Sequence, residues 1–189
     1  SFAAFATGGL LLTTLVVAAP AAVAEEYVCR GTVGAATLDN VTVPTGATCT
    51  LDGTTLEGTL KVERGATAVV SGADIDGNIQ SQGHRSVTVT DTRVGGSIQL
   101  EQGGAAYLRD NRVNGDVQLF TNRTGTKSVY TNTIGGNLQC KDNVPAPVGG
   151  GNVVDGNAED QCRDLTRPVA PGDVPDPAPA PIGTGSLGS

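Results

Sequence analysis

The chain has 189 residues, with 19 acidic and 12 basic side chains and a formal net charge of −7 at pH 7. Nucleic acid and anionic lipid are disfavoured as partners, because no basic patch is present to displace their counterions. No phosphate-cradling glycine loop and no nucleophile elbow occurs in the sequence, and no cofactor is predicted.

Residues 1–24 carry no charge and include an apolar run from Leu10 to Ala19. The run is followed by Ala22-Val23-Ala24 and then by two glutamates. An apolar stretch of this length that ends in a small-x-small site is typical of a secretory signal peptide, and we expect cleavage after Ala24. The mature chain is therefore predicted to be secreted or located at the cell surface, without insertion into the membrane.

The region from residue 25 to residue 162 repeats with a period of about 19 residues. Its anchors are apolar residues at intervals of 19, 19, 19, 19 and 21: Val41, Leu60, Ile79, Ile98, Val117 and Leu138. Each unit contains two short stretches of alternating apolar and polar residues, which indicate β-strands. A unit of this length cannot bury its own apolar face, so neighbouring units must stack into a solenoid.

The repeat predicts an all-β fold, a single-stranded parallel β-helix of five to six coils with 19–21 residues per coil. Its uneven turns favour a right-handed helix, because left-handed hexapeptide helices keep regular coils. A glycine recurs two residues before each anchor from Leu60 onward, where the backbone is expected to turn sharply or to approach its neighbour closely. The alternative is a β-sandwich with coincidental spacing.

The four cysteines are expected to form two disulfides in an oxidising compartment. Cys29 and Cys49 are 20 residues apart, and Cys140 and Cys162 are 22 apart, so each pair is separated by about one coil. Pairing the first coils with the last would span several rungs of roughly 4.8 Å, well past the roughly 7 Å limit between bridged Cα atoms. The sequence therefore predicts the pairs Cys29–Cys49 and Cys140–Cys162, which cap the two ends of the solenoid. No metal site is predicted, since there is no CxxC and the only histidine, His84, is remote.

After Cys162 the composition changes to a proline-rich stretch that ends in glycine and serine. Residues 163–189 are therefore predicted to form an extended tail or linker without a core.

The candidate binding residues point outward between the buried positions. They are four glutamines and three aromatic residues: Gln80, Gln99, Gln118, Gln139, Phe120, Tyr107 and Tyr130. The glutamines should form a ladder along the axis, either as reinforcement of the sheet or as a surface that matches the hydroxyls of a polysaccharide. Recognition is further expected where the period breaks, between Phe120 and Tyr130 and beyond Lys141.

A weaker catalytic candidate lies at the polar turn of two successive units, where Asp91 and Arg93 precede Asp110 and Arg112. Clustered carboxylates that hold calcium, together with a basic residue, are the chemistry of a β-helix polysaccharide lyase. The alternative is a surface ladder of ion pairs. His84, which follows Gly83 in a turn, is expected to be solvated.

Two segments carry a family resemblance. The stretch from Asn132 to Pro147, continued by residues 149–162, resembles the closing motif of uncharacterised secreted β-helix proteins of Gram-positive bacteria. The stretch from Asn40 to Leu51 resembles their opening coil. The resemblance implies a right-handed β-helix of the pectate-lyase-like superfold and an extracellular location, with no established catalytic residues.

The predicted function is that of an exported, non-enzymatic component of the cell surface or matrix, with a structural or adhesive role. Its expected partner is a cell-wall or extracellular polysaccharide, or a surface protein. The alternatives are a carbohydrate-active enzyme of the polysaccharide-lyase type and a polymer-forming scaffold.

Overall fold

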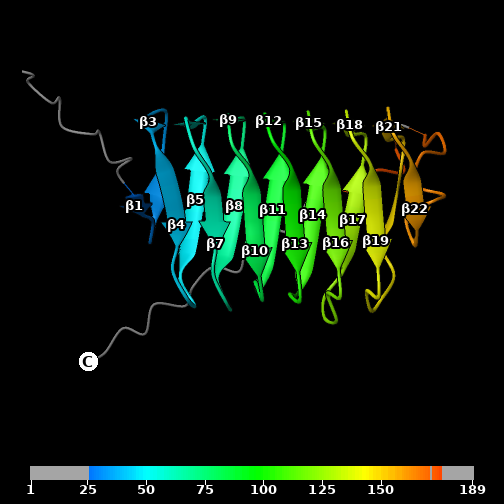
Figure 1. Cartoon of the computed structure of the whole chain (residues 1–189), viewed down its shortest axis with the longest axis horizontal. Helices are drawn as coiled ribbons and strands as arrows, with labels where there is room; N and C mark the ends of the chain where they lie inside the picture. The colour runs from blue at the N-terminus through cyan, green and yellow to red at the C-terminus, as the bar shows by residue number, and fades with distance from the viewer. Residues whose placement is uncertain (1–25, 171, 176–189) are drawn as a thin grey trace, which may run out of the picture.

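The computed structural model describes residues 26–170 and 172–175. This part of the chain is a parallel β-solenoid of about seven turns, in which three parallel sheets wrap one core. The coils stack in chain order from β1 (Glu26–Val28) at one end to β22 (Ala158–Asp160) at the other (Figure 1). The predicted signal peptide lies outside the described residues.

Each complete turn contributes one strand to each sheet. Sheet A holds eight strands: β1, β4 (Asn40–Val43), β7 (Leu60–Val62), β10 (Ile79–Gln82), β13 (Ile98–Glu101), β16 (Val117–Phe120), β19 (Leu138–Lys141) and β22. Sheet B holds seven: β2 (Thr32–Val33), β5 (Thr48–Asp52), β8 (Thr67–Ser71), β11 (Ser86–Thr90), β14 (Ala105–Arg109), β17 (Lys127–Tyr130) and β20 (Val148–Gly150). Sheet C holds seven strands of two residues: β3 (Thr37–Leu38), β6 (Thr55–Leu56), β9 (Asp74–Ile75), β12 (Arg93–Val94), β15 (Arg112–Val113), β18 (Thr133–Ile134) and β21 (Val153–Val154).

The 19-residue period sets the register of these sheets. Ile79 on β10 pairs with Ile98 on β13, and like residues therefore stack on like residues. All six anchors are buried, as is the column two residues further on, which runs from Val43 to Cys140. Burying one such aliphatic side chain contributes about 1.5–3 kcal/mol. The predicted parallel β-solenoid is confirmed, and its handedness stays a prediction.

The structure has more coils and one more sheet than the repeat indicated. In the first coil Tyr27 pairs with Val41, only 14 residues away, so a 19-residue period misses this turn. The strands of sheet C are two residues long, too short to show alternation. The second residue of most of these strands points inward and belongs to a buried apolar column that includes Leu56 and Ile75.

The recurring glycines mark close backbone contact between coils. A Cβ added to Gly77 would lie 2.5 Å from the carbonyl oxygen of Gly58 in the preceding coil. No side chain fits at that distance, so the predicted close approach of the backbone is confirmed.

Both predicted disulfides are formed, Cys29–Cys49 with a Cα–Cα distance of 5.6 Å and Cys140–Cys162 with one of 5.3 Å. Each bridge joins a terminal coil to its neighbour. The predicted domain boundary at residue 162 stays a prediction, although the chain continues to contact the solenoid beyond it: Leu165 is buried, and its carbonyl accepts hydrogen bonds from the backbone and side chain of Asn152. The part of the chain that the structure describes contains no helix capable of spanning a membrane.

Candidate recognition surface

A continuous row of amides runs along the outer face of sheet A. Nε2 of Gln80 donates to Oε1 of Gln99 at 2.8 Å, and Nε2 of Gln99 donates to Oε1 of Gln118 at 3.0 Å. Gln118 continues the row to Gln139 at 2.8 Å, and Gln139 donates to a carboxylate oxygen of Glu159 at 2.8 Å. We call the four glutamines the glutamine row. The structure thus brings together the glutamines that the sequence singled out, and their role in binding stays a prediction.

The polar residues that precede the glutamine row accept hydrogen bonds from backbone N–H groups of the next coil. Oδ1 of Asn78 accepts the backbone N–H of Ser97 at 2.8 Å, and Oγ of Ser97 accepts that of Asp116 at 3.0 Å. Asp116 repeats the pattern with Asn137 at 2.7 Å. These side chains satisfy donors at the corner of the next coil, and so their role is to hold successive coils together.

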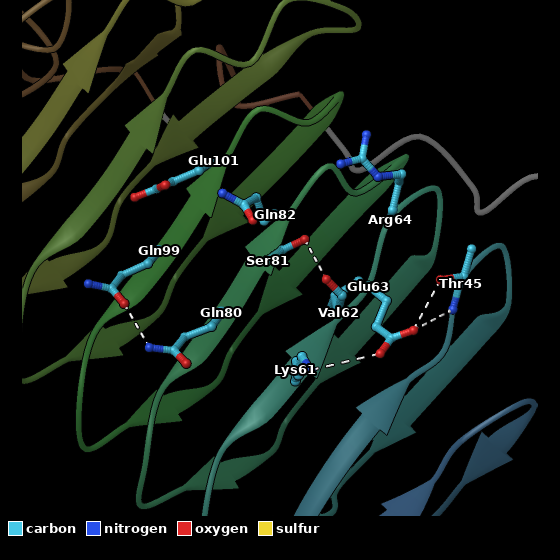
Figure 2. A pocket seen from close by; sticks show the side chains of 10 residues that line it. All are labelled: Thr45, Lys61, Val62, Glu63, Arg64, Gln80, Ser81, Gln82, Gln99 and Glu101. Carbon is cyan, nitrogen blue, oxygen red and sulfur yellow. Dashed lines mark hydrogen bonds and ion pairs between the residues drawn. The ribbon is translucent and has the colours of Figure 1, made fainter.

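A shallow hollow of about 530 Å³ opens at one end of the glutamine row. Figure 2 shows Gln80 and Gln99 at one side of it, with Glu63 and Thr45 at the other. The hollow is lined mainly by polar and charged residues, and it carries charges of both signs. Its charged lining residues are Lys61, Glu63, Arg64 and Glu101.

Glu63 is held in place by its neighbours. Its Oε2 accepts the backbone N–H of Thr45 at 3.0 Å and the Thr45 hydroxyl at 3.1 Å, and its other oxygen lies 3.8 Å from Nζ of Lys61. The backbone N–H of Thr45 lowers the pKa of the Glu63 carboxyl, and its hydroxyl and Lys61 add to this effect. The hollow therefore presents an oriented, ionised carboxylate at neutral pH.

The three predicted aromatic residues lie on two different faces. Phe120 is on β16 in sheet A, in register with Glu101 and Lys141, and is partly exposed. Tyr107 on β14 and Tyr130 on β17 lie on the outer face of sheet B. Phe120 therefore shares the outer face of sheet A with the glutamine row, whereas the two tyrosines lie on another face and do not form one site with it.

The acid and arginine residues of the catalytic alternative lie at exposed corners near sheet C. Arg93 and Arg112 are in register, and Nε of Arg93 lies 3.8 Å from Oδ1 of Asp74. Asp91 and Asp110 have positive φ angles of 50° and 56°, conformations that suit a short polar residue in a turn. Exposed ion pairs of this kind contribute little individually. No group of three or more His, Cys, Asp or Glu placed to hold a metal occurs within residues 26–170 and 172–175.

Stacks of buried asparagines inside the corners were not foreseen. The Asn132 side chain donates to the Leu108 carbonyl at 3.0 Å and to Oδ1 of Asn152 at 2.9 Å. Its own Oδ1 accepts the backbone N–H of Asn111 at 3.1 Å and the Asn111 side chain at 2.9 Å. A second stack contains Asn122 and Asn143. The asparagines recur at coil spacing, and this recurrence is the signal in the sequence that indicates the stacks.

Lys127 occupies a position inside the solenoid. It pairs with Ala106 in a core column and is fully buried. Its Nζ donates to the carbonyls of Asn122 at 3.0 Å, Gly125 at 2.8 Å and Val144 at 2.9 Å, and also to that of Thr124 at 3.3 Å. Burial lowers the pKa of Lys127. The lengthened coil between Phe120 and Tyr130 is therefore organised around one ammonium group.

His84 is buried, with 2 % of its surface exposed, and the prediction of a solvated side chain is wrong. The turn does not expose it, because the next coil lies directly over the ring. A Cβ added to Gly103 would lie 2.3 Å from Cε1 of His84. Burial lowers the pKa of His84 to about 4, and the Lys127 charge acts in the same direction.

No family model matches the chain, and the searches of curated proteins and of solved structures find no match either. The solenoid fold is shown by the three parallel sheets of the structure. The resemblance to secreted proteins of Gram-positive bacteria remains a prediction.

Proposed function

We propose that the protein is an exported, non-enzymatic component of a cell surface or extracellular matrix that binds a linear polysaccharide along sheet A. Two formed disulfides are compatible with an oxidising, extracellular location. The observation that carries the proposal is the unused hydrogen-bonding capacity of the glutamine row.

A side-chain amide has two N–H donors and two acceptor lone pairs. Asn132, in the interior, uses all four with other residues of the chain. Gln99 donates one hydrogen bond to Gln118 and accepts one from Gln80. Among its contacts with the described residues, one donor and one acceptor remain for a ligand. The same count applies to Gln118.

The spacing of these open groups favours a periodic ligand. Successive coils lie roughly 4.8 Å apart, and the row therefore offers one donor and one acceptor at each step of that length. Sugar hydroxyls both donate and accept hydrogen bonds, and an extended β-1,4-linked glycan presents them at a similar repeat. A glycan lying along the axis would meet the same amide chemistry at each sugar.

The charges in the hollow favour a neutral polymer over a polyanion or a polycation. Lys61 and Arg64 are balanced by Glu63 and Glu101, so the lining attracts neither sign of charge strongly. Glu63 supplies strong acceptors for hydroxyl groups, since hydrogen bonds to an ionised group are about twice as strong as neutral ones.

The test is a pull-down of the purified protein on insoluble β-1,4-linked glucan and N-acetylglucosamine polymers, followed by titration with soluble oligomers of increasing length. We expect affinity to rise with oligomer length up to the span of the row. The variant Gln99→Leu removes both open groups of one rung. At about 1 kcal/mol per hydrogen bond, losing two should weaken binding by roughly tenfold or more.

The matched control is Thr50→Leu on the outer face of sheet B, which adds an aliphatic side chain away from the glutamine row. Thermal unfolding of both variants checks that the solenoid is retained. Equal retention of wild type, Gln99→Leu and Thr50→Leu would place any binding elsewhere, and absence of retention on every glycan would contradict the proposal itself.

A further inference from the structure

The chain beyond the second disulfide follows a defined path over the last coil. The carbonyl of Arg167 accepts the backbone N–H of Gly151 at 2.6 Å. The Val169 side chain then covers Gly150 and Gly151, where an added Cβ on Gly150 would lie 2.4 Å from Cγ1 of Val169. The absence of side chains at these two glycines makes room for the crossing chain.

A turn then carries the chain back along the solenoid. The backbone N–H of Asp173 donates to the carbonyl of Ala170 at 2.9 Å. Pro175 reaches Tyr107 on β14, and the Tyr107 hydroxyl donates to the Pro175 carbonyl. The last coil, with β20, and Tyr107 are two coils apart in sheet B, so the segment crosses coils along the axis.

The outer face of sheet B is shaped to receive such a segment. A groove of about 420 Å³ lies beside Tyr107, and Pro175 forms part of its lining. Small side chains form its floor on either side of the tyrosine, including Ser86, Ala105 and Ser128. Ser128 pairs with Tyr107 and therefore points outward, yet only 7 % of it is exposed.

We propose that the outer face of sheet B is a docking groove for the chain's own segment Gly172–Pro175, which straps the last coils together in cis. The pyrrolidine ring of Pro175 already fixes one backbone dihedral of the docked segment, so less conformational entropy is lost on docking. Tyr107 supplies the aromatic wall and the donor for a proline carbonyl. The strap occupies Tyr107 and leaves sheet A as the face that meets an external partner.

The sequence allows a direct test, because it contains only three tyrosines: Tyr27, Tyr107 and Tyr130. The full chain is produced with 3-fluorotyrosine, and the three ¹⁹F resonances are assigned from single Tyr→Phe variants. A nitroxide is attached at Pro175→Cys after the native disulfides have formed and been verified by mass spectrometry. We expect the Tyr107 resonance to lose most of its intensity and to regain it when ascorbate reduces the nitroxide.

Tyr27 on β1 is the internal control and should keep its intensity, since it lies in the first coil. A nitroxide at Asp173→Cys repeats the measurement without altering Pro175. Full intensity of Tyr107 with both labels would overturn the proposal. A second sample mixes fluorinated chains without nitroxide with nitroxide-labelled chains without fluorine. Loss of Tyr107 intensity in this mixture would also overturn it, because the occupant would then be the tail of a second copy.

Discussion

The buried His84 predicts a specific dependence of stability on pH. Its ring lies beneath the next coil, and neither ring nitrogen has a well-aligned hydrogen bond to the described residues. Burial is the main reason that its pKa falls from 6.5 to about 4. The Lys127 ammonium lowers the pKa further, and a backbone group of Ala105 partly opposes both effects.

The sign of the effect follows from which state binds the proton first. As the pH falls, the unfolded chain takes up a proton at its ordinary pKa of 6.5, whereas the folded chain does so only near 4. The contribution of the neutral, buried ring to stability is therefore complete above pH 6.5 and is lost progressively between pH 6.5 and about 4. The difference between the two pKa values corresponds to a loss of about 3 kcal/mol.

The measurement is guanidinium chloride unfolding of the wild type and of His84→Gln between pH 7.5 and 4. Carboxylates titrate in both proteins, so the difference between their free energies of unfolding isolates the histidine. We expect the wild type to lose about 3 kcal/mol more than the variant over this range. Because His84 is the only histidine, its ¹H resonances can be followed without assignment, and they should not titrate above pH 5.

Parallel stability curves for the wild type and His84→Gln would refute this reasoning, as would an imidazole that titrates near pH 6.5. The Lys127→Met variant provides a second check on the cause. Removing the nearby ammonium should raise the pKa of His84 and thereby reduce the pH-dependent loss.

Three further changes test the packing of the coils. Lys127→Met should lower the free energy of unfolding by a few kcal/mol at pH 7, because buried carbonyls lose their donor, and chemical denaturation measures the loss. Gly77→Ala should prevent the close approach to Gly58 and lower the midpoint of thermal unfolding, whereas an unchanged midpoint would mean that the backbone can move apart. Replacing Cys29 and Cys49 together by alanine opens a 20-residue loop and should cost about 3 kcal/mol in chemical denaturation; no loss would show that the first coil is held by other contacts.

Each coil of the solenoid is a nearly identical copy of the preceding coil, shifted along the axis, and this repetition explains what could be predicted from the sequence. Residues one coil apart share an environment, so a period of 19 identified the core columns, the disulfide pairs and the glutamine row. The period does not predict the first coil, because the step from Tyr27 to Val41 in sheet A is only 14 residues. The sequence does not predict sheet C either, because its two-residue strands are too short to show alternation.

The interior polar residues are hard to predict from the sequence for a different reason. Polar residues usually lie on the surface, but a stack can satisfy a buried amide with the same residue of the next coil. Asn132 is polar, buried and fully hydrogen-bonded for that reason. Lys127 is not predicted to be buried because its coil is two residues longer than the 19-residue period. With that period it does not align with Ala106, although the two residues pair in the structure. His84 has no such partner and gave no pattern to detect.

The repetition of coils along the axis also constrains where a ligand can be recognised on this surface. Identical residues in successive coils form hydrogen bonds with one another. Rows of this kind therefore differ in how many hydrogen-bonding groups remain open after these bonds have formed. Asn132, in the interior, uses all of its hydrogen-bonding capacity. Gln99 and Gln118, in the glutamine row, use half of theirs within the described chain. A ligand that used this remainder would need the period of the coils, because only then does each rung contribute equally. A short or irregular ligand would engage one or two rungs and bind weakly, whereas a polymer gains with every coil it crosses.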